Sequence, residues 1–133
     1  MKRGKKTLRQ KLIARADTLF SLYIRTRDNW TCCRCHKSYP NNSMGFHCSH
    51  YFGRTIKETR WDEKNCDGLC YGCHKIWEKE DREGYRTFKV TQLGQQGFDE
   101  LKYRSMITHV TTAFIQERID VMTSLLQEYG IVS

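Results

Sequence analysis

The sequence predicts a small α+β domain that a metal ion cross-links, with helices at both ends. The chain has only 133 residues, it contains two Cys-x-x-Cys pairs, and helical periodicity both precedes and follows these pairs. Hydrophobic residues make up 38% of the chain and the mean hydropathy is −0.73, so an ordinary core would be thin. We therefore expect a single domain over residues 1–133 in which metal ligation replaces part of the core.

The N-terminal residues carry an excess of positive charge. The formal net charge is +8, and seven of the 23 lysines and arginines fall within the first 15 residues, where no acidic residue occurs. We expect residues 1–7 to form a basic arm that contacts a nucleic acid, with a solvated, unstructured terminus as the alternative. The side chains expected to contact DNA, on this arm and farther along the chain, are Lys2, Arg3, Lys5, Lys6, Arg9, Arg54, Lys57 and Arg60.

Residues 8–27 are predicted to form an amphipathic helix. Apolar residues recur there at spacings of three and four, which places them on one side of a helix. They are Leu8, Leu12, Ala16, Leu19, Phe20, Tyr23 and Ile24. We expect this side to cover a zinc-binding module over residues 28–84.

The two cysteine pairs predict a structural zinc site. Cys32 and Cys35 form the first pair, and Cys70 and Cys73 form the second. Four thiolates can surround one Zn²⁺ ion in a closed tetrahedron that leaves no position for water. The spacing therefore indicates an ion that holds the fold together.

Neighbouring residues leave the ligand set open. Cys33 and His36 have the same spacing as the first pair and could replace it, and His74 directly follows the last cysteine and could replace a thiolate. Four matched thiolates favour the Cys32/Cys35 pair. The number of cysteines is odd and the N-terminus lacks the apolar core of a secretion signal, so we expect a reducing, intracellular compartment without disulfides. No apolar stretch is long enough to cross a membrane.

The order of the segments predicts a treble clef. The first cysteine pair forms a knuckle, residues 44–52 form the first arm of a hairpin, and the second pair begins a helix over about residues 73–83. A knuckle, a hairpin and a helix around one zinc ion make up that fold. Residues 53–63 between the arms are expected to form a long, mobile, basic loop.

Residues 85–133 are predicted to be a helical extension. A break is expected at the glycines of residues 94–97, and the β-branched residues between 107 and 112 divide the rest into one short and one long helix. Core packing is the expected role of the apolar faces of these helices. A homodimer contact through them is the alternative.

Histidines between the cysteine pairs predict a nuclease site. A one-metal nuclease needs a neutral imidazole to take a proton from water, a divalent cation to stabilise charge on the phosphate, and a group that orients them. His50 is the expected base. Asn65 is expected to bind the cation or to hold the hairpin, and His47 and His74 are candidate ligands of a catalytic Mg²⁺ or Mn²⁺ ion. His47 and His50 lie on opposite faces of a regular strand, so both can line one site only if the strand bulges.

These residues carry a resemblance to known nucleases. The order Cys-x-x-Cys, His50, Asn65 and Cys-x-x-Cys-His resembles the HNH, or ββα-metal, nucleases. More narrowly, residues 19–28, 47–51 and 60–65 look like the NinG/Rap recombination proteins of lambdoid phages. The likeness extends over about residues 8–80.

The resemblance implies a metal-dependent DNA endonuclease that cuts branched recombination intermediates, such as Holliday junctions and D-loops, in the cytoplasm of an infected bacterial cell. It implies His50 as the base, Asn65 as the motif asparagine and the four cysteines as zinc ligands. Ser49 departs from the acidic residue or histidine that many HNH proteins have before the base, and His74 stands where NinG-like sequences have asparagine. A non-catalytic zinc-finger DNA-binding or adaptor protein and a homing or restriction nuclease on linear duplex are the alternative functions.

Overall fold

The computed structural model describes residues 4–107 and 110–131. In these residues five α-helices surround a two-stranded sheet, which confirms the predicted small α+β class. The helices are α1 (Leu8–Arg27), α2 (Lys57–Arg60), α3 (Tyr71–Lys75), α4 (Arg82–Met106) and α5 (Thr112–Glu128). The strands are β1 (Phe46–His50) and β2 (Cys66–Cys70); η1 (Glu63–Asn65) is a 3₁₀ turn, and η2 (Ile76–Glu80) is a π-helical turn that continues α3.

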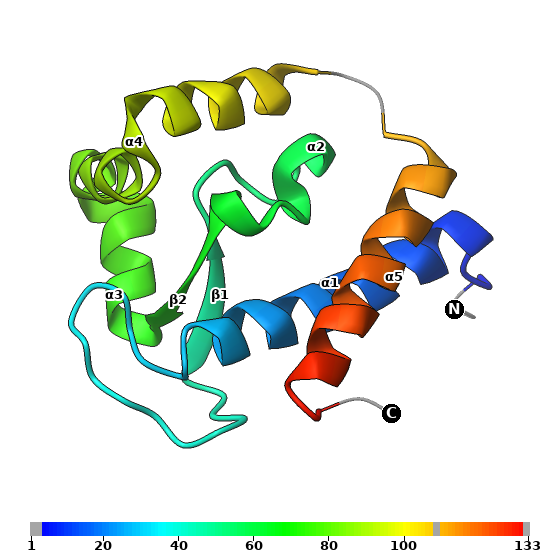
Figure 1. Ribbon diagram of the computed structural model, residues 1–133, viewed down its shortest axis with the longest axis horizontal. Coiled ribbons are helices and arrows are strands. Elements are labelled where there is room, and N and C mark those ends of the chain that lie inside the picture. The colour runs from blue at the N-terminus through cyan, green and yellow to red at the C-terminus, as the bar shows by residue number, and fades with distance from the viewer. Residues whose placement is uncertain (1–3, 108–109, 132–133) are drawn as a thin grey trace.

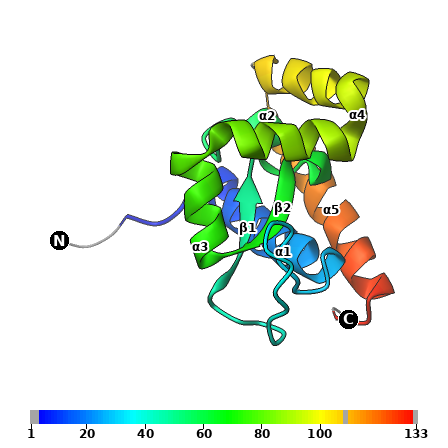
Figure 2. The ribbon, with the colours of Figure 1, turned by 90° about the vertical axis from the view of Figure 1, so that its left-hand side faces the viewer.

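The hairpin of β1 and β2 lies at the centre of the molecule, between α1 on one side and α3 and α4 on the other (Figures 1 and 2). Its strands are antiparallel and pair without interruption, from Phe46 opposite Cys70 to His50 opposite Cys66. Because side chains alternate along a strand, Cys48 and His50 point to one face. Ser49 points to the other.

Helix α1 has the predicted bounds because its first turn is capped. The Thr7 hydroxyl accepts a hydrogen bond from the backbone N–H of Gln10, and the Gln10 side chain accepts one from the N–H of Thr7. This capping box satisfies two backbone donors at the helix start. The buried side chains of the helix are Ala16, Leu19, Phe20, Tyr23 and Ile24, all from the predicted stripe.

Helix α5 packs along α1, as Figure 1 shows. Its buried side chains, spaced at three and four, are Ile115, Ile119, Met122 and Leu126, and they share one core with α1 and Trp61. The apolar face that was the alternative dimer contact is thus covered within the same chain. As predicted, the β-branched segment separates the last two helices, since α4 ends at Met106 and α5 begins at Thr112.

Helix α4 differs from the prediction at its start and confirms the expected break. It begins at Arg82, so the expected boundary between residues 84 and 85 falls in its first turn. The break predicted at residues 94–97 occurs at Gly94 (φ 74°, ψ 160°), whose backbone is not helical, so α4 consists of two helical segments that meet at a kink; glycine adopts this backbone conformation without a steric penalty. Tyr85 and Phe98 from α4 are buried in the second core, against Trp77. Helix α4 is therefore part of the central module.

A buried polar network joins α4 to β2. The Lys89 ammonium lies 3.1 Å from an Asp67 carboxylate oxygen, and both side chains are fully buried. The Tyr85 hydroxyl donates to the same oxygen over 3.0 Å, and the Gln92 amide donates to the other over 3.2 Å. Buried charges are tolerated when they are paired and hydrogen-bonded in this way.

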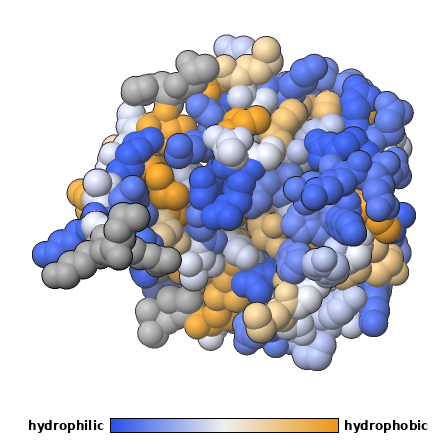
Figure 3. Space-filling view, turned by 180° about the vertical axis from the view of Figure 1, so that it is seen from behind, coloured by the Kyte–Doolittle hydropathy of each residue, from blue (hydrophilic) through white to orange (hydrophobic). Residues whose placement is uncertain are grey.

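The surface seen from behind is mostly hydrophilic, with separate hydrophobic patches between charged side chains (Figure 3). None of the helices in the described ranges combines the length and the apolar character that a membrane crossing requires.

Candidate metal centre and active-site pocket

The four predicted cysteines converge. The sulfur atoms of Cys32, Cys35, Cys70 and Cys73 all lie within 4.8 Å of one another, and those of Cys35 and Cys70 are 3.9 Å apart. A set of four sulfur donors is the chemistry of a closed tetrahedral zinc site. The residues therefore fit the expected structural ion.

Within each cysteine pair, a backbone N–H group points at the sulfur atom of the first cysteine. The N–H of Cys35 points at the Cys32 sulfur and that of Cys73 at the Cys70 sulfur, each over 3.5 Å. Cys70 is the N-cap of α3, as expected for a second pair at a helix start. Burial alone would raise the pKa of the Cys70 thiol, but hydrogen bonds, chiefly from Cys73, outweigh it and lower that pKa to about 7. The thiolate that binds metal is therefore accessible at neutral pH.

The alternative first pair lies outside the cluster. Cys33 is half-buried with its sulfur 3.5 Å from a carboxylate oxygen of Asp28, and burial and that carboxylate raise the pKa of its thiol. His36 is exposed at a positive φ of 64° in the knuckle. His74 does not join the four sulfurs either. The Cys32/Cys35 pair thus remains as the first pair.

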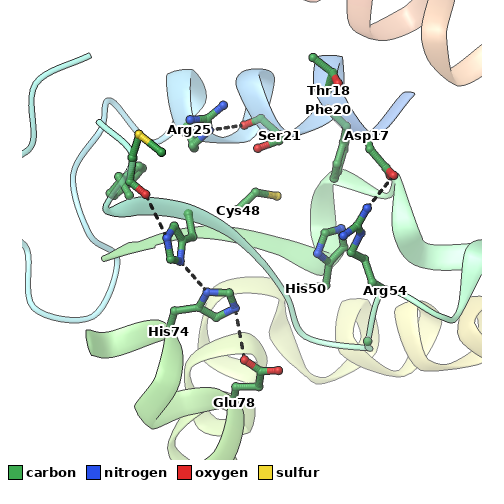
Figure 4. Close-up of a pocket in the computed structure, with 14 residues that line it drawn as sticks. Asp17, Thr18, Phe20, Ser21, Arg25, Cys48, His50, Arg54, His74 and Glu78 are labelled. Atoms are coloured by element: carbon green, nitrogen blue, oxygen red, sulfur yellow. Dashed lines mark hydrogen bonds and ion pairs between the residues drawn. The ribbon is translucent and has the colours of Figure 1, made fainter. Parts of the chain in front are cut away.

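A pocket of about 720 Å³ opens between α1, β1 and α3 (Figure 4). The residues that line it are Asp17, Thr18, Phe20, Ser21, Arg25, Met44, Phe46, His47, Cys48, His50, Gly53, Arg54, His74 and Glu78. Three of the four histidines in the described residues therefore border one cavity beside the cysteine cluster.

His47 and His74 form a close pair in this pocket. Their Nδ1 atoms are 3.1 Å apart. The His47 Nε2 donates to the Met44 carbonyl over 3.1 Å, so its Nδ1 carries a lone pair. The His74 Nε2 faces Glu78 at 3.7 Å, and burial lowers the pKa of His74, which keeps that imidazole neutral.

The spacing of this pair suits a shared cation. Nitrogen ligands bound at about 2.1 Å to one ion lie about 3.0 to 3.4 Å apart. Ligand histidines usually donate their other N–H to a carbonyl or a carboxylate, as His47 does towards the Met44 carbonyl. Glu78 lies 3.7 Å from the His74 Nε2, beyond hydrogen-bond distance. Without a cation, the His74 Nδ1–H donates to the lone pair of the His47 Nδ1.

His50 is held with one ring nitrogen available. Its Nε2 donates to the Arg60 carbonyl over 3.0 Å, which leaves Nδ1 as an acceptor. Burial is the main reason why the pKa of His50 is lowered to about 4; the bond to the Arg60 carbonyl and the charge of Asp17 oppose this shift, and the charges of Arg54 and Arg60 add to it. The imidazole is therefore neutral at pH 7, as a base that accepts a proton must be.

The strand contains no bulge, although the sequence argument required one. His47 and His50 point to opposite faces of β1 in an uninterrupted register, yet both line the pocket. In a sheet of only two strands β1 has an unpaired edge. Phe46, His47, Cys48 and His50 all line the pocket, so side chains from both faces of β1 border it.

Asn65 lies outside the pocket lining and is fully buried. Its amide oxygen accepts from the N–H of Phe52 over 2.8 Å, and its amide nitrogen donates to the carbonyls of Phe52 and Thr59 over 3.0 Å each. Of its two expected roles, this geometry corresponds to holding the hairpin. Asn65 is thus a positioning residue.

The basic residues expected to contact DNA divide into two groups. Lys2 and Arg3 lie outside the described residues, and Lys5 and Lys6 are exposed on a segment that extends from the body (Figure 2). The remaining side chains are partly engaged: Arg9 donates to the Val110 carbonyl, Lys57 is half-buried on α2, and Arg54 and Arg60 pair with Asp17.

Asp17 organises the loop after β1, a role that sequence reasoning missed. It binds the guanidinium of Arg60 through both carboxylate oxygens and also accepts from Arg54 and from the Trp61 indole. The loop over residues 53–63 is therefore tied to α1 instead of being open. Arg60 is only 14% exposed in its side chain, while Arg54 and Arg25 line the pocket.

Replacing Asp17 with asparagine is expected to destabilise the protein by about 1.5–3 kcal/mol, the usual contribution of hydrogen bonds to a charged group. Burial alone would raise the pKa of Asp17, but its bonds to Arg60 and Arg54 lower it below the ordinary value. The contribution is therefore complete at neutral pH and is lost as the pH falls through the folded pKa. Urea denaturation at pH 7 measures it, with exposed Asp99→Asn as the control; equal losses would contradict the role of Asp17.

Comparison of the chain with protein-family models, curated proteins and solved structures finds no significant match.

Proposed function

We propose that this protein is a metal-dependent DNA endonuclease of the HNH type that cuts branched recombination intermediates. The observation that carries the proposal is the arrangement of His47, His50 and His74 around one pocket beside the four cysteines. The preference for branched DNA rests on the resemblance of the sequence to the NinG/Rap proteins.

A treble clef is the proposed scaffold. The knuckle at Cys32 and Cys35, the β1–β2 hairpin, and helix α3 beginning at Cys70 follow one another around the converging sulfur atoms. Zinc bound to the four thiolates stabilises this module. The hairpin then supplies His47 and His50, and the helix supplies His74.

In the proposed mechanism His50 is the general base. Its Nδ1 accepts a proton from water, while the bond from Nε2 to the Arg60 carbonyl fixes the ring and its tautomer. His47 and His74, whose Nδ1 atoms lie 3.1 Å apart, would hold a divalent cation. When bound, this cation stabilises negative charge on the scissile phosphate and on the leaving oxygen.

The donor set favours Mn²⁺ over Mg²⁺ as the cofactor. Imidazole nitrogens suit transition ions, whereas Mg²⁺ prefers carboxylate and water oxygens. His47 and His74 supply two nitrogens, and the Glu78 carboxylate lies 3.7 Å from the other ring nitrogen of His74. Of the two expected ions, Mn²⁺ therefore fits this pair better.

The DNA contact is electrostatic in this proposal. Arg25 and Arg54 line the pocket, and Lys5 and Lys6 extend from the body next to α1. Contacts of this kind bind phosphates without reading the sequence, and the affinity that they give falls steeply with salt.

Replacing His50 with alanine is expected to lower the rate of cleavage about 10² to 10⁴-fold, the contribution of a positioned general base. The assay uses a synthetic four-way junction and a linear duplex of the same arm sequence, with Mn²⁺ or Mg²⁺. The matched control is His36→Asn, an exposed histidine away from the pocket, since asparagine tolerates the positive φ at that position.

Each outcome of this assay has one interpretation. Loss of cleavage in His50→Ala, with full zinc content and full activity of His36→Asn, supports the proposal. Undiminished cleavage by His50→Ala contradicts the assignment of His50 as the general base. Junction binding by the wild type without cleavage of any substrate favours the adaptor alternative, and preferred cutting of one linear sequence favours a homing or restriction nuclease.

A further inference from the structure

A second group of metal-binding side chains converges under α1. The sulfur atoms of Cys48 and Cys66 and a ring nitrogen of His50 all lie within 4.8 Å of one another. Cys48 and His50 share one face of β1, and Cys66 lies opposite His50 across the hairpin. Residues paired in this way project to the same side of a sheet. The strand register therefore gathers all three, apart from the four-cysteine cluster.

The local bonding leaves one ring nitrogen of His50 with a lone pair. Its Nε2 donates to the Arg60 carbonyl, so Nδ1 carries the lone pair. Histidines that bind metals commonly have this arrangement, with a carbonyl fixing the opposite nitrogen. Figure 4 shows Cys48 and His50 rising from the same strand towards α1.

Access from the pocket also suits a cation at this place. Cys48 and His50 line the pocket, so a cation that enters from solvent meets them first, and fully buried Cys66 lies behind them.

We propose that Cys48, His50 and Cys66 form a second zinc site, with water as the fourth ligand, and that zinc bound there inhibits cleavage. In a tetrahedral site the ligand atoms lie about 3.4 to 3.8 Å apart, which small side-chain rotations achieve here. Each thiol releases its proton to the solvent when it binds zinc. Two thiolates then neutralise the ion, which lowers the cost of burying it.

The proposed inhibition of cleavage by zinc rests on the proposed nuclease function, whereas the proposed binding of zinc does not. Zinc bound to Nδ1 of His50 occupies the atom that otherwise accepts the proton from water. The His50 imidazole therefore serves either as a base or as a zinc ligand, and the concentration of free zinc determines which of the two states is populated.

Titration of the reduced, zinc-loaded, full-length protein with Co²⁺ tests the site without DNA. Cobalt takes the same ligands as zinc, and its bonds to thiolates give a charge-transfer absorbance that a site made only of histidines lacks. We expect one equivalent of sulfur-bound cobalt in the wild type and in Cys33→Ser, whose thiol lies outside both clusters. We expect none in Cys48→Ala or Cys66→Ala with full zinc content.

Two results would overturn the site. One is a wild type that shows no sulfur-linked cobalt absorbance, and the other is a Cys48→Ala variant that matches the wild type. Circular dichroism and zinc content establish that each variant is folded. Cys48 is only half-buried, so we expect Cys48→Ala to fold and to test the site even if Cys66→Ala does not fold.

Cleavage in the presence of added zinc tests the inhibition separately. Withdrawal of a general base lowers a rate about 100-fold or more, so we expect a loss of this size in the wild type and in Cys33→Ser. Cys48→Ala is expected to keep most of its own zinc-free rate. A protein that binds cobalt through sulfur but cuts no DNA supports the site and contradicts the nuclease proposal. Cobalt binding together with zinc-insensitive cleavage overturns the inhibition.

Discussion

Replacing Cys73 with serine is expected to abolish zinc binding and to leave the central module unfolded. Apparent binding free energies of structural zinc are about 10–16 kcal/mol, which equals or exceeds the whole stability of a typical domain, about 5–15 kcal/mol. Cys73 is one of four converging sulfurs and is almost fully buried. Loss of this ligand therefore removes the largest single contribution to folding.

Zinc content and near-ultraviolet circular dichroism measure this result. The control is Cys33→Ser, because this thiol has the same chemistry but lies outside the cluster, and a serine hydroxyl can still donate to Asp28. We expect the control to keep the zinc content of the wild type and to unfold cooperatively. A Cys73→Ser protein that is folded without zinc would show that zinc bound to the four cysteines is not required for folding.

Replacing either partner of the buried Asp67–Lys89 pair is expected to destabilise the protein by about 3–5 kcal/mol. Both side chains are fully buried, so Asp67→Asn leaves an uncompensated ammonium and Lys89→Met leaves an uncompensated carboxylate. The double variant leaves neither charge. We expect it to lose much less stability than the two single losses added together, because neutral residues of similar size often replace a buried pair at little cost.

Urea denaturation of the zinc-loaded proteins at pH 7 gives these free energies. Lys79→Met, at an exposed lysine on η2, is the matched control and is expected to change stability by less than about 0.5 kcal/mol. Additive losses in the double variant would show that the two charges do not depend on each other. The cycle therefore tests whether this pair joins α4 to the hairpin.

Local patterns account for the parts of the fold that the sequence predicted well. The bounds of α1 follow from apolar spacing and from a cap formed by Thr7 and Gln10, which are three residues apart. The convergence of four cysteines follows from two pairs whose own backbones turn their sulfurs inwards. These patterns act within a few residues, so they can be interpreted without knowledge of the rest of the chain.

The errors arose where distant segments meet. The expected boundary between residues 84 and 85 lies inside α4, because Tyr85 packs into the same core as Trp77. The loop over residues 53–63 is tied to α1 because Asp17 on that helix, 43 residues before Arg60, accepts hydrogen bonds from the Arg60 guanidinium. The requirement for a bulge failed because a two-stranded sheet leaves β1 with a free edge.

By itself the sequence determined that two Cys-x-x-Cys pairs could share one ion, where the first helix lies and which histidines belong to the interval between the pairs. The tertiary structure placed Cys32 and Cys35, and not Cys33 and His36, in one cluster with the second pair. Only the tertiary structure decided that His47 faces His74, that Asn65 is buried in backbone hydrogen bonds, and that Cys48 and Cys66 meet at His50. Spacing along the chain determines the face of an element on which a side chain lies. What that face meets depends on strand register and on the packing of segments far apart in sequence.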